Sequence, residues 1–168
     1  MKTIANTAKS KYQSGAHIAA GRALKPICDK LKPTPLDFWL YLVMDQGRFG
    51  AHAEYLFAVK CMERGYDVSM PLKHTSIYDM IIDTGDRLIK VQVKASAQPP
   101  REQQKSVNVM IYKSNNQMYK VGEIDFIALY VHEFQGFFIF KYDQPKKSYR
   151  VHPEGKYKKH FNNFAFDL

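Results

Sequence analysis

The chain has few cysteines and no long apolar run. Its 168 residues include only two cysteines, Cys28 and Cys61, which make neither a disulfide framework nor a zinc-ligand spacing. We expect them to be free, buried thiols of a protein kept in a reducing, cytoplasmic environment. No apolar stretch approaches the roughly 20 residues of a membrane-spanning helix. No continuous apolar core follows Lys2, which argues against a secretory signal, so we expect no membrane partner.

Signatures of several enzyme classes are also missing. The sequence contains no Gly-rich phosphate loop of the NTPase kind, no HEXXH motif and no Cys/His zinc spacing. No local sequence supports a Ser/His/Asp triad. There is no internal repeat, and the length suits one domain with a substantial core.

Positive charge is concentrated at the two ends of the sequence. The net charge of +9 divides into +6 for residues 1–32, −1 for residues 33–140 and +4 for residues 141–168. This distribution suits a near-neutral central site flanked by segments that contact phosphates. An equally good explanation from charge alone is that the basic ends only increase solubility. We predict a basic helical extension over residues 1–45, followed by a domain over residues 46–168 that ends in a basic tail.

Residues 77–96 predict a β-hairpin. Two runs rich in Ile, Val and Tyr, residues 77–82 and 88–94, read as strands. Between them, residues 83–86 (Asp-Thr-Gly-Asp) form a strong turn signal. The second run alternates apolar and polar side chains, as a strand with two different faces does.

The hairpin register decides which polar side chains meet. If Thr84 and Gly85 form a two-residue loop, Asp79 falls opposite Lys90, and directly paired residues share a face of the sheet. Asp79 then lies on the same face as Lys90, Gln92 and Lys94. A slip of one residue would separate them, so this inference depends on the loop length.

Further elements surround the hairpin. A helix is predicted from Asp45, its N-cap, to Arg64, with Gly65 ending it and Glu54 at the border of its buried stripe. Additional strands are expected at residues 66–70, 107–112, 124–131 and 137–142. The predicted fold class is α/β, with a mixed, mostly antiparallel central sheet, helices before and beside it, and an N-terminal helical extension.

The order of these residues resembles the core of the PD-(D/E)XK nucleases. There an Asp in one strand is followed, after a short hairpin, by Glu, Gln or Asp, any residue and Lys; here these are Asp79 and Gln92-Val93-Lys94. A preceding helix often supplies a further Glu, a place that Glu54 occupies. Residues 122–131 resemble the next strand in the branch that contains a group I intron homing endonuclease and is similar to archaeal Holliday junction resolvases.

The resemblance covers residues 47–140 and departs from the family pattern at two positions. Tyr78 stands in place of the Pro, and Gln92 replaces the commoner Glu. The short motif is degenerate by itself, and its value comes from helix, Asp, hairpin and strand following in order. The predicted fold is accordingly a restriction-endonuclease-like core.

The resemblance implies a metal-dependent endonuclease that hydrolyses phosphodiester bonds of double-stranded or branched DNA. Mg²⁺, with Mn²⁺ as a substitute, would be held by Asp79, Glu54, the Gln92 amide oxygen and the Val93 carbonyl. Lys94 would orient or activate the attacking water. Because Gln92 carries one negative charge less than Glu, we expect weaker metal binding.

Candidate DNA contacts surround this core. They are basic or polar residues in the hairpin, the adjoining loops and the basic, aromatic-rich tail. The set is Lys90, Ser76, His74, Arg101, Lys105, Lys146, Lys147, Arg150, Lys158 and Lys159.

Several functions remain open from the sequence alone. A site-specific endonuclease of the homing or restriction type leads, with a Holliday junction resolvase of the same fold next. A DNA-binding protein without catalysis is the third, since Gln92 can also mark an inactive relative, and an Asp79–Lys94 or Asp79–Lys90 pair can be a simple surface ion pair. Cutting both strands needs two sites, so a homodimer or homotetramer with two-fold symmetry is expected.

Overall fold

The structure is a computed structural model that describes residues 45–73, 75–100, 105–113 and 115–167. The predicted extension over residues 1–45 therefore lies outside the described residues except for Asp45, and so do His74 and Arg101. Within the described ranges, no helix has the length and apolar character needed to cross a membrane.

Helix α3 (Gln46–Met62) begins and ends close to where the sequence predicts. The Asp45 side chain accepts a hydrogen bond from the Arg48 N–H at 2.9 Å and so caps the first turn. Gly65, with φ of +83°, follows the C-cap Glu63 and turns the chain toward the sheet. One side of the helix is buried, through Phe49, Ala53, Phe57, Ala58 and Cys61.

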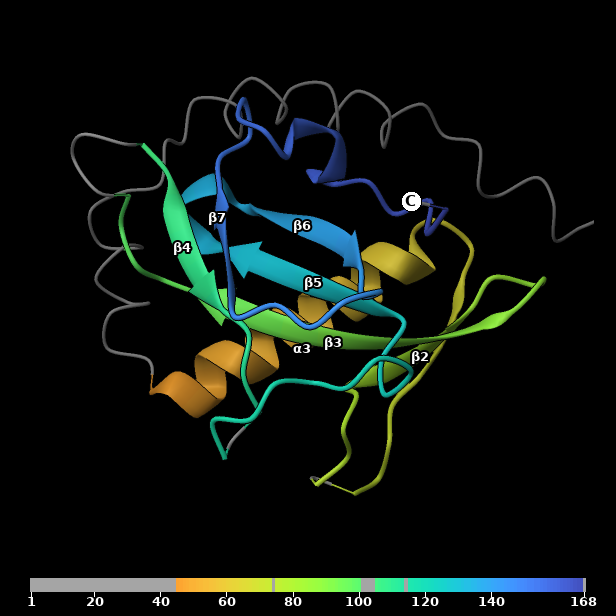
Figure 1. The fold of residues 1–168 in the computed structure, drawn as a ribbon. Helices are drawn as coiled ribbons and strands as arrows, with labels where there is room; N and C mark the ends of the chain where they lie inside the picture. Colours follow the sequence, from red (N-terminus) through yellow and green to blue (C-terminus); the bar gives the residue numbers. More distant parts are fainter. Residues whose placement is uncertain (1–44, 74, 101–104, 114, 168) are drawn as a thin grey trace, which may run out of the picture. The chain divides into compact units, whose positions relative to one another are not determined.

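A five-stranded mixed sheet forms the centre of the fold (Figure 1). Its strands are β1 (Asp67–Ser69), β2 (Met80–Asp83), β3 (Leu88–Ser96), β5 (Phe126–Val131) and β6 (Gly136–Lys141). They lie in the order β1-β2-β3-β5-β6, and only the β3–β5 pair is parallel. The predicted mixed, mostly antiparallel α/β sheet is confirmed.

A second, two-stranded sheet consists of β4 (Val107–Met110) and β7 (Ser148–Val151). Two short 3-10 turns, η1 (His132–Phe134) and η2 (Lys158–His160), complete the described elements. The sequence did not predict β7, which falls inside the basic tail. Its Tyr149 ring stacks on Phe140 with ring centres 4.0 Å apart, so this part of the tail also builds the core.

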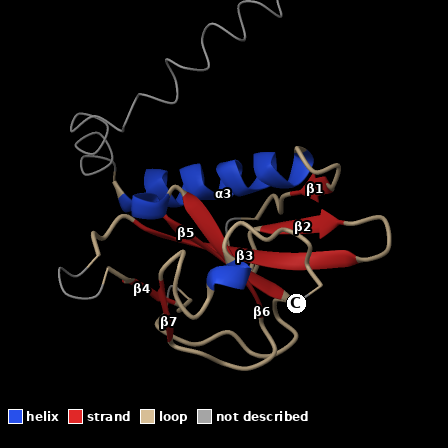
Figure 2. Cartoon of the chain, turned by 90° about the horizontal axis from the view of Figure 1, so that it is seen from above, coloured by secondary structure: helices blue, strands red, loops and turns tan. Residues whose placement is uncertain are grey.

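The central sheet separates two apolar clusters. Figure 2 shows α3 along one face of the sheet, with β4 and β7 on the other side. The cluster under α3 includes Met80, Val91 and, from late in the sequence, Phe164 and Phe166. The cluster toward β4 and β7 is built by alternate residues of β5, such as Leu129. Strand β5 is therefore buried on both faces, which fixes β3 beside it in the interior of the sheet.

The hairpin loop between β2 and β3 is longer than the two-residue loop expected from the sequence. Asp83 pairs with Leu88 and Ile81 with Lys90, and the Thr84 N–H closes the turn by donating to the Arg87 carbonyl at 3.1 Å. The register therefore differs by two positions from the expected one. A shift of two leaves every side chain on its expected face, but it puts Gln92 rather than Lys90 level with Asp79.

Candidate active site

Asp79 sits where β2 begins, one residue before its regular pairing with β3. Its N–H donates to the Val91 carbonyl at 2.9 Å, which continues the ladder. Its carboxylate oxygen Oδ2 accepts from the Val93 N–H at 2.7 Å. The side chain thus bonds a β3 amide that lies beyond the end of the β2 ladder, and this holds the carboxylate against the middle of β3.

Gln92 is a buried polar residue on this central strand, with 6% of its surface exposed. A buried carboxamide needs hydrogen-bond partners. Its Nε2 donates to Asp79 Oδ2 and to the Val93 carbonyl oxygen, the latter at 3.2 Å. One carboxylate oxygen and one carbonyl oxygen therefore converge on a single point beside Gln92.

Glu54 and Lys94 complete the group from α3 and from the far part of β3. Both residues are half-buried. They line an open cleft of about 810 Å³ together with Asp79, Gln92 and Val93. The cleft is bounded by the first turns of α3 and by residues 95–99, which lead out of β3.

Burial first, and then the neighbouring charges, shift the pKa values of the three ionisable groups in this cleft. Burial, reinforced by the Asp79 carboxylate, raises the pKa of Glu54 to about 7, against a smaller lowering by Lys94. Burial also raises the pKa of Asp79, although hydrogen bonds from Val93 and Gln92 and the Lys94 charge oppose it. Burial lowers the pKa of Lys94, which both carboxylates counteract. Desolvated carboxylates that face each other in a cleft are typical of a functional site.

The oxygen atoms of this group suit a hard divalent cation. Across the described part of the chain, no cluster of three or more His, Cys, Asp or Glu side chains could hold a metal. The cleft instead offers two carboxylates, one main-chain carbonyl and one carboxamide, which are oxygen donors of the kind that Mg²⁺ accepts while keeping several waters. A divalent positive charge would also relieve the repulsion between Asp79 and Glu54.

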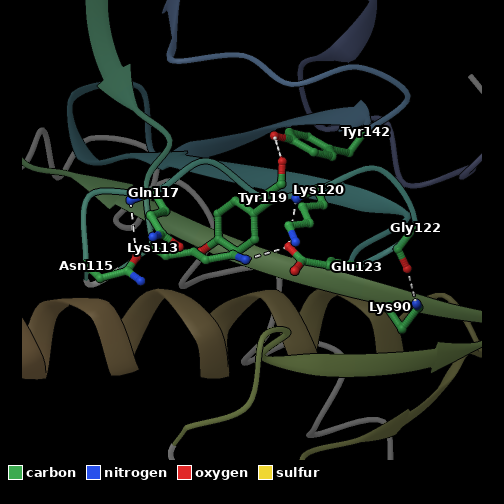
Figure 3. Close-up of polar contacts among 9 residues, drawn as sticks. All are labelled: Lys90, Lys113, Asn115, Gln117, Tyr119, Lys120, Gly122, Glu123 and Tyr142. Atoms are coloured by element: carbon green, nitrogen blue, oxygen red, sulfur yellow. Dashed lines mark hydrogen bonds and ion pairs between the residues drawn. The ribbon is translucent and has the colours of Figure 1, made fainter.

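Lys90 does not join this group, although it shares a face of β3 with Gln92 and Lys94. Its Nζ donates to the Gly122 carbonyl at 2.6 Å (Figure 3). Its N–H donates to Asp125 Oδ2 at 2.8 Å. Ser76 lies half-buried in the loop before Asp79, and its N–H donates a hydrogen bond to the Lys73 carbonyl. Lys105 is exposed and lies two residues before β4.

The predicted DNA contacts of the tail fall into two groups. Lys146 lies 4.0 Å above the Tyr149 ring, and Lys158 pairs with Glu154, so both ammonium groups have partners within the domain. Lys147, Arg150 and Lys159 are exposed. Lys158 is exposed as well, but Glu154 engages its ammonium, so Lys147, Arg150 and Lys159 are the better placed to meet a polyanion.

Tyr119 is a site neighbour that sequence reasoning missed. Its ring centre lies 5.7 Å from Lys94 Nζ, and the Asp79 charge contributes, after burial, to raising the pKa of its hydroxyl. It lies 40 positions beyond Asp79 in an irregular connection between β4 and β5. No spacing or motif in the sequence indicates this approach.

Comparison with known proteins identifies the family to which this fold and cleft belong. A model of the PD-(D/E)XK endonuclease family matches residues 44–165, and the chain belongs to that family. Members of this family generally use divalent metal ions. The resemblance predicted from Asp79, the hairpin and residues 92–94 is confirmed.

Among solved structures, the chain is similar to a bacterial homing endonuclease, I-Ssp6803I. The two share 20% sequence identity, and the match covers 70% of this chain and 87% of that one with a TM-score of 0.58. At this identity the likeness concerns the fold, and it confirms the restriction-endonuclease-like core. No curated protein matches the chain.

Proposed function

We propose that the protein is a Mg²⁺-dependent DNA endonuclease whose active site is the cleft between α3 and β3, with Mn²⁺ as a substitute for Mg²⁺. The observation that carries the proposal is the convergence of Asp79 Oδ2 and the Val93 carbonyl on the Gln92 amide, beside Glu54 and Lys94. Membership of an endonuclease family supports the same reaction class.

Asp79, Glu54, Gln92 and Val93 are the residues that would hold the ion. A bound Mg²⁺ would supply positive charge to the phosphate and lower the pKa of a coordinated water. Asp79 is held for this task by the Val93 N–H at 2.7 Å. Gln92 would offer its oxygen after rotating the carboxamide, because its Nε2 now faces the two acceptor oxygens.

Lys94 is the group that would orient the attacking water and meet the charge on the phosphate. Its burial lowers its pKa, which makes the ammonium a better proton donor and the neutral amine more accessible near neutral pH. The Asp79 and Glu54 charges oppose that shift and attract the ammonium. In this position Lys94 can also stabilise negative charge that develops on the phosphate oxygens.

For the substrate, we propose specific sites on double-stranded DNA, as expected for a homing or restriction enzyme. The similar solved structure is that of a homing endonuclease. Lys147, Arg150 and Lys159 are exposed and would contact phosphates, and Lys90, Ser76 and Lys105 are further proposed contacts. A homodimer or homotetramer would supply two active sites for two strands.

The deciding experiment compares Asp79→Asn with Asp125→Asn. Both carboxylates accept a hydrogen bond from a β3 N–H, Asp79 from Val93 and Asp125 from Lys90. Wild type and both variants would be incubated with supercoiled plasmid, a randomised duplex pool and a synthetic four-way junction, each with Mg²⁺ or EDTA. We expect metal-dependent cutting by wild type and Asp125→Asn, and none by Asp79→Asn.

Other outcomes point to other functions. Preferential cutting of the four-way junction would indicate a Holliday junction resolvase. Equal DNA binding by all three proteins, without any cutting even after Gln92→Glu, would indicate a non-catalytic DNA-binding protein. Cutting by Asp79→Asn at the wild-type rate would contradict the proposed site itself.

A further inference from the structure

The connection between β4 and β5 brings an aromatic ring against the candidate active site. Tyr119 in this connection is only 3% exposed. Its ring centre lies 5.7 Å from the Nζ of Lys94, within the range of a cation–π contact. The Asp79 and Glu54 carboxylates act on the same Lys94 charge from the cleft. Tyr119 is therefore the aromatic wall that this ammonium faces among the described residues.

The chain around Tyr119 is held by contacts within the connection and by one contact from the segment after β6. Lys113 Nζ pairs with Glu123 Oε2 at 2.6 Å, and the same oxygen accepts from the Lys120 N–H at 2.7 Å (Figure 3). These contacts tie the start of the connection to its end on either side of Tyr119. The Tyr142 hydroxyl donates to the Tyr119 carbonyl at 3.0 Å and anchors the middle to the segment after β6.

The ion pair also has an electrostatic consequence for Lys94. Lys113 Nζ lies 5.6 Å from the centre of the same Tyr119 ring, so two ammonium groups approach one aromatic side chain. The Glu123 carboxylate neutralises Lys113, and both side chains of the pair are about one-fifth exposed (20% and 21%). Repulsion of Lys94 by Lys113 is reduced as a result.

We propose that Tyr119 is a positioning residue for Lys94, with its ring as the surface that holds the ammonium at the cleft. The proposal rests on the function proposed above, because it assigns Tyr119 a role through Lys94. A lysine side chain has a long, flexible stem that loses much rotamer freedom when it is fixed. A rigid ring removes alternative positions before DNA arrives, and misplacement by about 1 Å can cost on the order of 100-fold in rate.

The test compares Tyr119→Phe with Tyr119→Leu in single-turnover cleavage. The Phe variant keeps the ring and removes only the hydroxyl, whereas the Leu variant keeps an apolar side chain and removes the ring. We expect the Phe variant to stay within about twofold of wild type and the Leu variant to cut about tenfold more slowly, with a dissociation constant for DNA in EDTA unchanged within about twofold. Equal rates for Leu and wild type would overturn the proposal.

A second measurement does not depend on cleavage. The ¹³C-labelled Lys94 ε-methylene should show a ring-current shift in its NMR signal in wild type and Tyr119→Phe, and this shift should be lost in Tyr119→Leu. Lys94→Met identifies the signal. An unchanged Lys94 signal in the Leu variant would also overturn the proposal, even if the protein proved to cut no DNA.

Glu123→Gln covers the case in which Tyr119→Leu does not fold. This variant breaks the ion pair that ties the connection together but leaves the ring. It should shift the Lys94 signal in the same direction and slow cleavage about threefold. A Glu123→Gln variant with the wild-type signal would contradict the role of the Lys113–Glu123 pair in holding the ring against Lys94. Failure of wild type to cut, with the ring-current shift intact, would count against the proposed function alone.

Discussion

Two lysines of strand β3, Lys90 and Lys94, each have an aspartate from another segment nearby, and the two Asp/Lys pairs differ in their surroundings. At one position, Asp125 accepts from the Lys90 N–H at 2.8 Å and donates its own N–H to the Lys90 carbonyl at 2.9 Å. The Lys90 ammonium bonds the Gly122 carbonyl. At the other position, Asp79 and Lys94 face the Glu54 carboxylate in a cleft.

The difference lies in what each set of polar atoms is used for. Around Asp125 the hydrogen bonds join β3 to the chain that enters β5, so they serve the sheet. Around Asp79, its own carboxylate and the Val93 carbonyl converge on the Gln92 amide. The desolvated Glu54 carboxylate lines the same cleft, so like charges remain close together. Residue type alone therefore does not mark a site; convergence of acceptors with unfavourable charge proximity does.

The strongest test of the difference between the two pairs is to replace each lysine with Met. Lys94→Met should lower the single-turnover cleavage rate at saturating DNA by at least about 100-fold, because it removes the group that handles the attacking water. Lys90→Met should leave that rate within about threefold. It should lower the free energy of unfolding by about 1–2 kcal/mol, through the lost bond to Gly122. Similar cleavage rates for the two variants would show that the two pairs do not differ in their role in catalysis.

Gln92→Glu tests how the charge around Asp79 affects metal binding. A third carboxylate beside Asp79 and Glu54 should tighten Mn²⁺ binding about tenfold in a calorimetric titration without DNA, because the ligand charge rises by one. The metal-free protein should lose stability, since like charges become closer neighbours. Gln98→Glu, at the exposed rim of the same cleft, is the matched control. Equal tightening by both variants would mean that only net charge matters.

The smallest expected effect concerns the pH dependence of stability without metal. The pKa of Glu54 is about 7 in the folded protein, against 4.5 for a glutamate fully exposed to water, as in the unfolded chain. The stabilising contribution of Glu54 is therefore complete below pH 4.5 and is lost as the pH rises through 7. Glu54→Gln should match wild type near pH 4.5 and exceed its free energy of unfolding by about 1–2 kcal/mol at about pH 8, after allowance for solvent screening.

Urea denaturation in EDTA at about pH 4.5 and about pH 8 measures this difference. Glu63→Gln is the control, because Glu63 is exposed at the end of the same helix. If the free energy of unfolding changes equally with pH in Glu54→Gln and in wild type, Glu54 is not desolvated by its neighbours.

The sequence indicates much of this site because its chemistry lies on local elements. Asp45 caps α3, the alternation along β3 sets the faces, and a register error of two residues left Asp79 on the face of Gln92 and Lys94. Tyr119 could not be found in this way. Its position depends on an irregular connection held by Lys113, Glu123 and Tyr142, which no periodicity records.

The strand inside the tail was missed for a related reason. Basic residues between aromatic ones fit a nucleic-acid surface, but the same alternation suits a strand with one buried face. Tyr149 and Val151 turn inward in β7, while Arg150 stays exposed. The pairing with β4 and the stacking on Phe140 place the Tyr149 side of this segment in the core, and the exposed basic residues stay proposed DNA contacts.

The packing of Phe164 and Phe166 under α3 has a consequence for the order in which the protein is made. Phe57 contacts both rings, with ring centres 5.2 Å and 6.4 Å away. A ribosome completes α3 about a hundred residues before it adds these two rings, so the core beneath Glu54 stays open during most of synthesis. Such long sequence separations slow folding. We therefore expect the nascent chain to carry all of its proposed catalytic residues well before it can cut DNA.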